Sequence, residues 1–309
     1  MIINTGQRTD IPAFYSEWFI NRIKAGFVLV RNPYNPKLVT KFKLDPKIVD
    51  VIGFCTKNPR PMFKYLDILK PFGQFWYITI TGFDTDLEPN VPKIDEVIED
   101  FKYLSNKIGK NSIAIRYTPI IINEKYTKER HIKTFEYIIS KLSGYTNLAT
   151  FGFLDIYPKL EKNHKDLKDT DDKTKIEISL EFNRIAKKYN MELRLCSKEK
   201  WLKEYDIDVN GCMRLEDYER SIGKNLIIKK RMDARKNYCS CLISNDIGMY
   251  NTCPHLCKYC YANGDKKIII DNYMMHNPNS PLLIGDIKED DIIKDANQES
   301  YIDRRISLF

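Results

Sequence analysis

The chain has 309 residues, 43% of them hydrophobic and 30% charged, which is enough to bury one large core. It holds no apolar run of about eighteen residues and no signal-peptide pattern at its N-terminus, so we expect a cytoplasmic protein with no membrane partner. The net charge of +8 would allow a nucleic-acid partner, but without a dense basic tract a lysine-rich solvated surface is the favoured interpretation.

Strand and helix patterns alternate along the first two thirds of the chain. The first predicted helix begins after Asp10, which either caps that helix or, with Arg8 and Thr9, faces a substrate. The β-branched and apolar runs predict strands at 27–30, 49–55, 75–81, 112–117, 148–156 and 192–196. The amphipathic patterns predict helices at 11–25, 62–69, 93–108, 128–142 and 174–188.

This alternation predicts an α/β fold with a parallel sheet and covering helices. Polar side chains such as Lys57, Asp84 and Arg116 end predicted strands, where the active sites of βα barrels lie. We therefore expect a partial or permuted (β/α) TIM-like barrel at 1–195. A cysteine-rich segment at 196–265 would complete it, and a cap or tail would follow at 266–309. No G-x-G-x-x-G motif supports a Rossmann domain.

The strongest signal is the spacing of three late cysteines, Cys253, Cys257 and Cys260, in C-x3-C-x2-C. Thiolates this close can converge on one metal centre, and a [4Fe–4S] cluster normally takes four. With only three local ligands, one iron would keep an open position, as reactive metal sites do. The alternative is a zinc knuckle with His255 as the fourth ligand, although residues so close in sequence rarely reach one metal ion in tetrahedral geometry.

Four further cysteines cluster after the barrel segment: Cys196, Cys212, Cys239 and Cys241. Clustered thiols in a reducing cytosol indicate metal rather than disulfides. They predict a second metal centre, with a second [4Fe–4S] cluster favoured over zinc. The alternative is that these thiols pack as small hydrophobic groups, which is our interpretation of Cys55 in its apolar strand.

The cysteine loop, with Tyr259 before its last cysteine, resembles the cluster loop of radical S-adenosylmethionine (SAM) enzymes. Other loops resemble, in the same order, those of the spore photoproduct lyase-like branch. These pieces are N-P-Y-N-P at 32–36, T-K at 56–57, T-G-F-D-T-D-L-E-P-N-V-P at 81–92 and P-I-I at 119–121. The cysteine loop comes first in that branch and last here. A circular permutation explains this if a strand at 247–251 lies beside the N-terminal strand.

The chain through Asn263 also resembles the uncharacterised family DUF1848. The radical SAM resemblance implies a [4Fe–4S] cluster that cleaves SAM, an electron donor such as flavodoxin or ferredoxin, and an unknown substrate. It implies that Lys57 contacts the SAM carboxylate, and that Asp84, Arg116 and Tyr259 bind SAM or the substrate. The alternatives are a nucleic-acid repair or modification lyase and a non-enzymatic protein that binds zinc or an iron–sulfur cluster.

Overall fold

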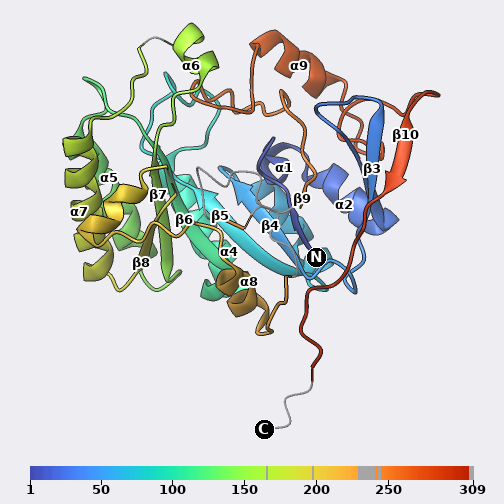
Figure 1. Ribbon diagram of the computed structural model, residues 1–309, viewed down its shortest axis with the longest axis horizontal. Helices are drawn as coiled ribbons and strands as arrows, with labels where there is room; N and C mark the ends of the chain where they lie inside the picture. Colours follow the sequence, from blue (N-terminus) through green and yellow to red (C-terminus); the bar gives the residue numbers. More distant parts are fainter. Residues whose placement is uncertain (165, 197, 229–240, 243–244, 306–309) are drawn as a thin grey trace.

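The centre of the molecule is a seven-stranded sheet in which every neighbouring pair is parallel (Figure 1). The structure is a computed structural model that describes residues 1–164, 166–196, 198–228, 241–242 and 245–305. From one edge to the other the strands are β8 (Glu192–Leu195), β7 (Leu148–Phe153), β6 (Ile113–Ile120), β5 (Gly73–Thr79), β4 (Val51–Thr56), β1 (Ile2–Asn4) and β9 (Asn245–Asp246). The protein is therefore a mixed α/β fold, as predicted.

The order of the strands shows how the chain is wound. From β1 to β8 each new strand of this sheet is added on the same side, and β9 then joins β1 at the other edge. The strand before the cysteine loop thus lies beside the N-terminal strand, as the permutation requires. Within the described residues β8 and β9 are the two edges, so the sheet is open and a closed barrel is not shown.

The predicted strand at 247–251 is placed wrongly. The strand is Asn245–Asp246, and only Ile247 continues the pairing, through its N–H to the carbonyl of Asn4 at 3.0 Å. The chain then turns into the cysteine loop, where Asn251 has a left-handed φ of 57° that no strand can contain.

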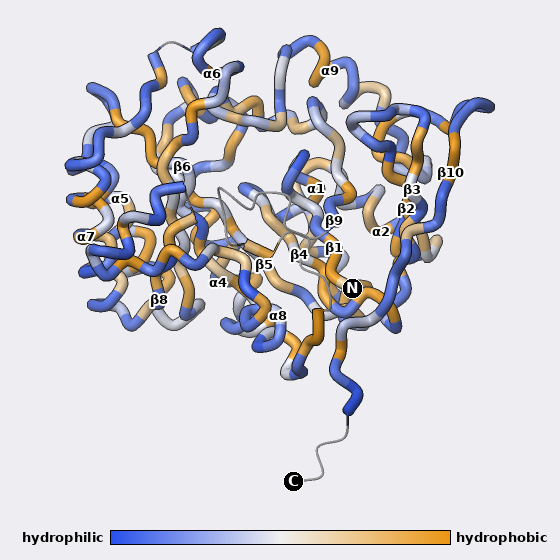
Figure 2. Tube along the Cα trace, viewed as in Figure 1, coloured by the Kyte–Doolittle hydropathy of each residue, from blue (hydrophilic) through white to orange (hydrophobic). Residues whose placement is uncertain are grey.

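One face of the sheet packs on three long helices, α4 (Ile94–Ile108), α5 (Lys128–Leu142) and α7 (Asp172–Lys188). Their apolar sides meet the strand residues of the main core, such as Phe54, Trp76 and Phe151. Figure 2 shows hydrophobic residues along these strands and hydrophilic ones at the outer turns. No helix in the described ranges combines the length and the apolarity needed to cross a membrane.

The opposite face, which we call the inner face, is covered by residues that follow β8. We call residues 212–228 and 241–242 of this segment the cover. Helix α8 (Leu215–Ile222) and its neighbours pack here on alternate strand residues, including Val51, Phe75, Tyr77, Ala114 and Leu148. The register sets this alternation, because Cys55 pairs with Tyr77, and Thr79 pairs with Arg116. Cys55 and Arg116 therefore share the inner face.

A small second sheet contains β2 (Phe27–Arg31), β3 (Leu38–Lys43) and β10 (Ile292–Asp295), in the order β10-β3-β2. The predicted strand at 27–30 belongs to this sheet and not to the large one, since it forms a hairpin with β3, which was not predicted. The C-terminal tail, predicted to be irregular, supplies β10 and helix α9 (Lys266–Met274).

The remaining helices are short. The predicted helix at 11–25 is two helices, α1 (Ile11–Phe14) and α2 (Ser16–Ala25), because Tyr15 leaves the helical region with φ −129° and donates its hydroxyl to the carbonyl of Thr252 at 2.5 Å. The others are α3 (Leu66–Leu69), α6 (Pro158–Asn163) and the 3-10 helices Arg60–Tyr65, Lys110–Ser112 and Lys200–Tyr205.

Candidate functional site

The cysteine loop begins directly after β9, at the end of the sheet where the carboxyl ends of the parallel strands lie. Its backbone is closed by Asn263, whose side chain donates to the carbonyl of Cys253 at 2.7 Å, and by Asn251, whose N–H donates to Ala262 at 2.9 Å. Leu256 adopts a left-handed φ of 56° between two of the cysteines. Such a conformation costs a leucine roughly 1–3 kcal/mol and is concentrated at binding sites.

The three thiols of this loop are withdrawn from water. Cys253 is buried, and Cys257 and Cys260 are half-buried. Burial raises the pKa of Cys257 to about 12, and it also raises the pKa values of Cys253 and Cys260. Metal binding at these sulfurs would therefore have to displace protons, which favours assembly at higher pH.

The sulfurs are not spaced for one shared ion, because they do not all lie within 4.8 Å of one another. His255 does not serve as a fourth ligand either. Its Nε2 lies 3.0 Å from Oδ2 of Asp10, and its Nδ1 lies 3.0 Å from the carbonyl oxygen of Asn90. Both ring nitrogens are therefore hydrogen-bonded to oxygen atoms. The loop fits a polynuclear cluster with three protein ligands better than a zinc knuckle.

Lys57 directly follows β4 and lies beside this loop. Its Nζ lies 2.8 Å from Oε1 of Glu88, and both side chains are nearly buried, with 12% and 3% exposed. Thr81 donates to the same Glu88 oxygen at 2.7 Å, and the Tyr259 hydroxyl also donates to it. Burial disfavours the Lys57 ammonium, but Glu88 and Cys257 outweigh it and raise the pKa of Lys57.

Tyr259 therefore has a defined partner. It binds Glu88, and its ring lies 5.9 Å from the Lys57 ammonium. Two more contacts bind the 81–92 loop to the cysteine loop: Asn90 donates to Pro254 at 2.8 Å, and the N–H of Lys258 donates to Leu87 at 3.0 Å. Two sequence motifs that are far apart in the chain thus form one site.

Asp84 and Arg116 are engaged elsewhere. Asp84 is half exposed and forms ion pairs with Lys125 at 2.9 Å and Arg130 at 3.0 Å. Arg116 donates to the sulfur of Cys212 at 3.7 Å on the inner face. Burial disfavours its charge, but Cys196 and Cys212 outweigh it, so the pKa of Arg116 lies well above its usual value.

A second group of thiols gathers on the inner face. The sulfurs of Cys196, Cys212 and Cys241 all lie within 4.8 Å of one another, and no other group of three or more His, Cys, Asp or Glu ligands in the described ranges does so. Cys196 follows β8 and passes over Gly152, where a Cβ would lie 2.4 Å from its carbonyl oxygen. Cys239, the fourth predicted member, lies outside the described residues.

Cys55 is half-buried at the end of β4, and burial raises its pKa. The chain after β1 crosses it closely, because a Cβ on Gly6 would lie 2.1 Å from the Cys55 carbonyl oxygen. This packing agrees with its interpretation as a core residue.

Two residues at the site were quoted in the sequence analysis without a metal or SAM role. Glu88 lies in the L-E-P part of the motif at 81–92. Its place in that motif was the signal that could have assigned it to the site. Asp10 does cap α1, through Ala13 at 3.1 Å, but it also accepts from the Lys57 N–H at 2.8 Å and binds His255. Its alternative role, facing a substrate, stays a prediction.

The fold and these side chains define an α/β protein with a singly wound parallel sheet and two groups of buried or half-buried thiols. The chain belongs to the family described as "Domain of unknown function (DUF1848)", whose model matches residues 2–262. Comparison with curated proteins and with solved structures found no match.

Proposed function

We propose that this protein is a radical SAM enzyme whose [4Fe–4S] cluster is held by Cys253, Cys257 and Cys260. One observation carries the proposal: β9 pairs with β1, so the cysteine loop follows a strand of the parallel sheet and meets the loops of its neighbours. The proposed architecture is an open partial barrel, rejoined at a different point in the chain. When bound, the cluster would supply the electron that cleaves SAM into a 5′-deoxyadenosyl radical and methionine.

The chain's own residues would bind and orient SAM. Lys57 and Glu88 offer one cation and one anion beside the loop. These charges match the carboxylate and amino groups of the methionine part of SAM. Tyr259 and Thr81, which both donate to Glu88, would hold its carboxylate in place and leave Lys57 free to share its charge with a ligand.

The cover on the inner face would keep water from that side of the site. The electron donor, a flavodoxin or ferredoxin, and the substrate belong to the proposal as classes only. Asp84 is less suited to SAM than the sequence predicted, because two surface cations already pair with it.

The proposal is tested by anaerobic reconstitution with iron and sulfide. The reduced protein should show the electron paramagnetic resonance signal of a [4Fe–4S] cluster, and SAM should change that signal because it binds the open iron. Cys257→Ala should lose the signal, whereas Cys55→Ala should keep it. A wild-type protein that holds no iron under these conditions would contradict the proposal.

A further inference from the structure

The three sulfurs on the inner face all lie within 4.8 Å of one another, whereas those of the cysteine loop do not. The sulfur of Cys212 lies 2.9 Å from that of Cys196 and 3.3 Å from that of Cys241. Zinc–sulfur bonds of about 2.3 Å in a tetrahedron place ligand sulfurs about 3.8 Å apart. In a [4Fe–4S] cluster each thiolate binds a different iron, so its sulfurs lie farther apart than those that share one ion.

We propose that Cys196, Cys212 and Cys241 bind a single four-coordinate zinc ion, and not the second iron–sulfur cluster that the sequence favoured. Three of the ligands of this ion come from the described residues. The proposal does not rest on the function proposed above, because it uses different residues and a different face of the sheet.

Arg116 supplies the first independent support. Its side chain is half-buried on β6, and its Nη1 donates to the Cys212 sulfur at 3.7 Å. In the described part of the chain no carboxylate lies within ion-pair distance of this guanidinium. A cation withdrawn from water needs an anionic partner, and neutral thiols do not provide one. Three thiolates around a divalent ion carry one net negative charge, which Arg116 would balance.

The backbone supplies the second support. The N–H of Cys212 donates to the sulfur of Cys241 at 3.2 Å, and such a bond stabilises a thiolate more than a thiol. The carbonyl of Cys212 in turn accepts from the Tyr77 hydroxyl at 2.9 Å, so the sheet itself holds this loop. Hydrogen bonds of this kind orient metal ligands and raise affinity.

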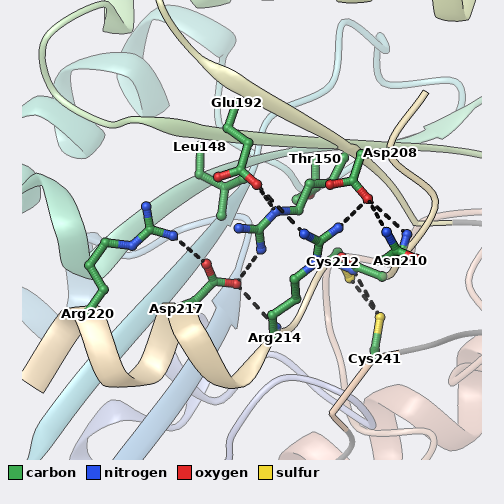
Figure 3. Close-up of polar contacts among 12 residues, drawn as sticks. Leu148, Thr150, Glu192, Asp208, Asn210, Cys212, Arg214, Asp217, Arg220 and Cys241 are labelled. Carbon is green, nitrogen blue, oxygen red and sulfur yellow. Dashed lines mark hydrogen bonds and ion pairs between the residues drawn. The ribbon is translucent and has the colours of Figure 1, made fainter. Parts of the chain in front are cut away.

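An ion-pair network holds the chain on both sides of Cys212 (Figure 3). Arg194 of β8 binds Asp217 of α8 at 2.6 Å, and Arg214 binds Asp208. Cys196 directly follows β8, whereas Cys212 and Cys241 belong to the cover of the inner face. One ion would therefore fasten the cover to the sheet, which is the role of a structural zinc site.

The test is a count of zinc, iron and sulfide per chain after anaerobic reconstitution. We expect one zinc ion per chain in the wild type. Cys212→Ser should lose the zinc and retain the iron, whereas Cys257→Ser should lose the iron and retain the zinc. Cys55→Ser, a thiol on the same face outside the triad, should retain zinc. Iron and sulfide for two clusters without zinc, or zinc retained in Cys212→Ser or lost in Cys55→Ser, would overturn the proposal.

A second measurement does not depend on the folding of a cysteine variant. The wild-type protein loaded with Co²⁺ should show the intense visible bands of tetrahedral cobalt bound to thiolates, whereas weak octahedral bands would overturn the proposal. Arg116→Gln should lower zinc affinity roughly 10- to 100-fold, as loss of an outer partner does, and Arg116→Lys should recover part of it. Arg184→Gln, an exposed arginine on α7 away from this network, is the control. Equal affinities in all of these proteins would refute the role of Arg116.

Discussion

At the scale of single residues, the proposed SAM site depends on Lys57 and Glu88. They form a nearly buried ion pair at 2.8 Å, and Thr81 and Tyr259 also donate to Glu88. A buried pair of this kind is weak evidence for stability, because desolvation offsets much of the attraction. Its place against the loop therefore favours a binding role over a structural one.

Lys57→Met should weaken SAM binding to the reconstituted protein. A hydrogen bond to a charged group contributes about 1.5–3 kcal/mol, so the dissociation constant should rise roughly 10- to 100-fold. Anaerobic equilibrium dialysis measures it directly. Lys64→Met, an exposed lysine in the same segment, is the matched control. Equal affinity in Lys57→Met and the control would show that Lys57 does not contact SAM.

At the scale of elements, the cover of the inner face depends on α8. Asp217 is fully buried in its first turn and binds Arg194 of β8, which is 3% exposed. The same carboxylate also binds Arg220 at 2.8 Å and the N–H of Arg214 at 3.2 Å. Of these three contacts, the one with Arg194 joins α8 to another element, so it fastens the helix to the edge strand of the sheet.

Asp217→Ala should lower the free energy of unfolding by about 3 kcal/mol, at the low end for a broken buried ion pair, because the buried Arg194 cation then keeps only the partly exposed Glu192, at 2.6 Å, as its partner. Denaturant titration followed by circular dichroism gives the value. Glu216→Ala, an exposed carboxylate next to it in the helix, should change stability by only a few tenths. Similar losses in the two variants would mean that the buried ion pair does not hold α8.

The small sheet is fastened to the tail in a pH-dependent way. Asp291, before β10, binds Arg31 of β2 through both oxygens at 2.5 and 2.7 Å. The hydrogen bonds from Arg31 lower the pKa of Asp291 to about 2, against an ordinary value of 3.8. Since the folded pKa is depressed, this stability is present above pH 3.8 and is lost as the pH falls towards 2.

Asp291→Asn should therefore remove part of the acid-induced loss of stability. The difference in melting temperature between wild type and variant should be largest above pH 3.8 and shrink towards pH 2. Asp290→Asn is the control, because its pair with Lys37 is exposed to water on both sides. A difference for Asp291→Asn that stays constant over this range would contradict the linkage.

At the scale of the whole molecule, the sequence pattern predicted the large sheet from its apolar and β-branched runs, and the long helices from apolar residues that repeat about every 3.6 positions. It did not predict β3, because the segment L-V-T-K-F-K resembles a charged surface segment when its partner strand β2 is not known. It missed the break at Tyr15, because a tertiary hydrogen bond to Thr252 forms that break.

The candidate site was predictable where its chemistry is local. The spacing of Cys253, Cys257 and Cys260 and the strand end at Lys57 are both visible in the sequence. The partnership of Lys57 with Glu88 was not, because it joins residues 31 positions apart across two strands. The place of Arg116 beside Cys212 was not visible in the sequence either, because only the strand register puts it on the inner face. Its role toward SAM or the substrate stays a prediction.

The most direct test of the proposed function is the fate of SAM itself. The reconstituted protein, reduced with dithionite under anaerobic conditions, should convert SAM to 5′-deoxyadenosine and methionine, as measured by liquid chromatography and mass spectrometry. Cys253→Ala, Cys257→Ala and Cys260→Ala should each abolish the product. Intact SAM after incubation with a wild-type protein that holds its full [4Fe–4S] cluster would contradict the account.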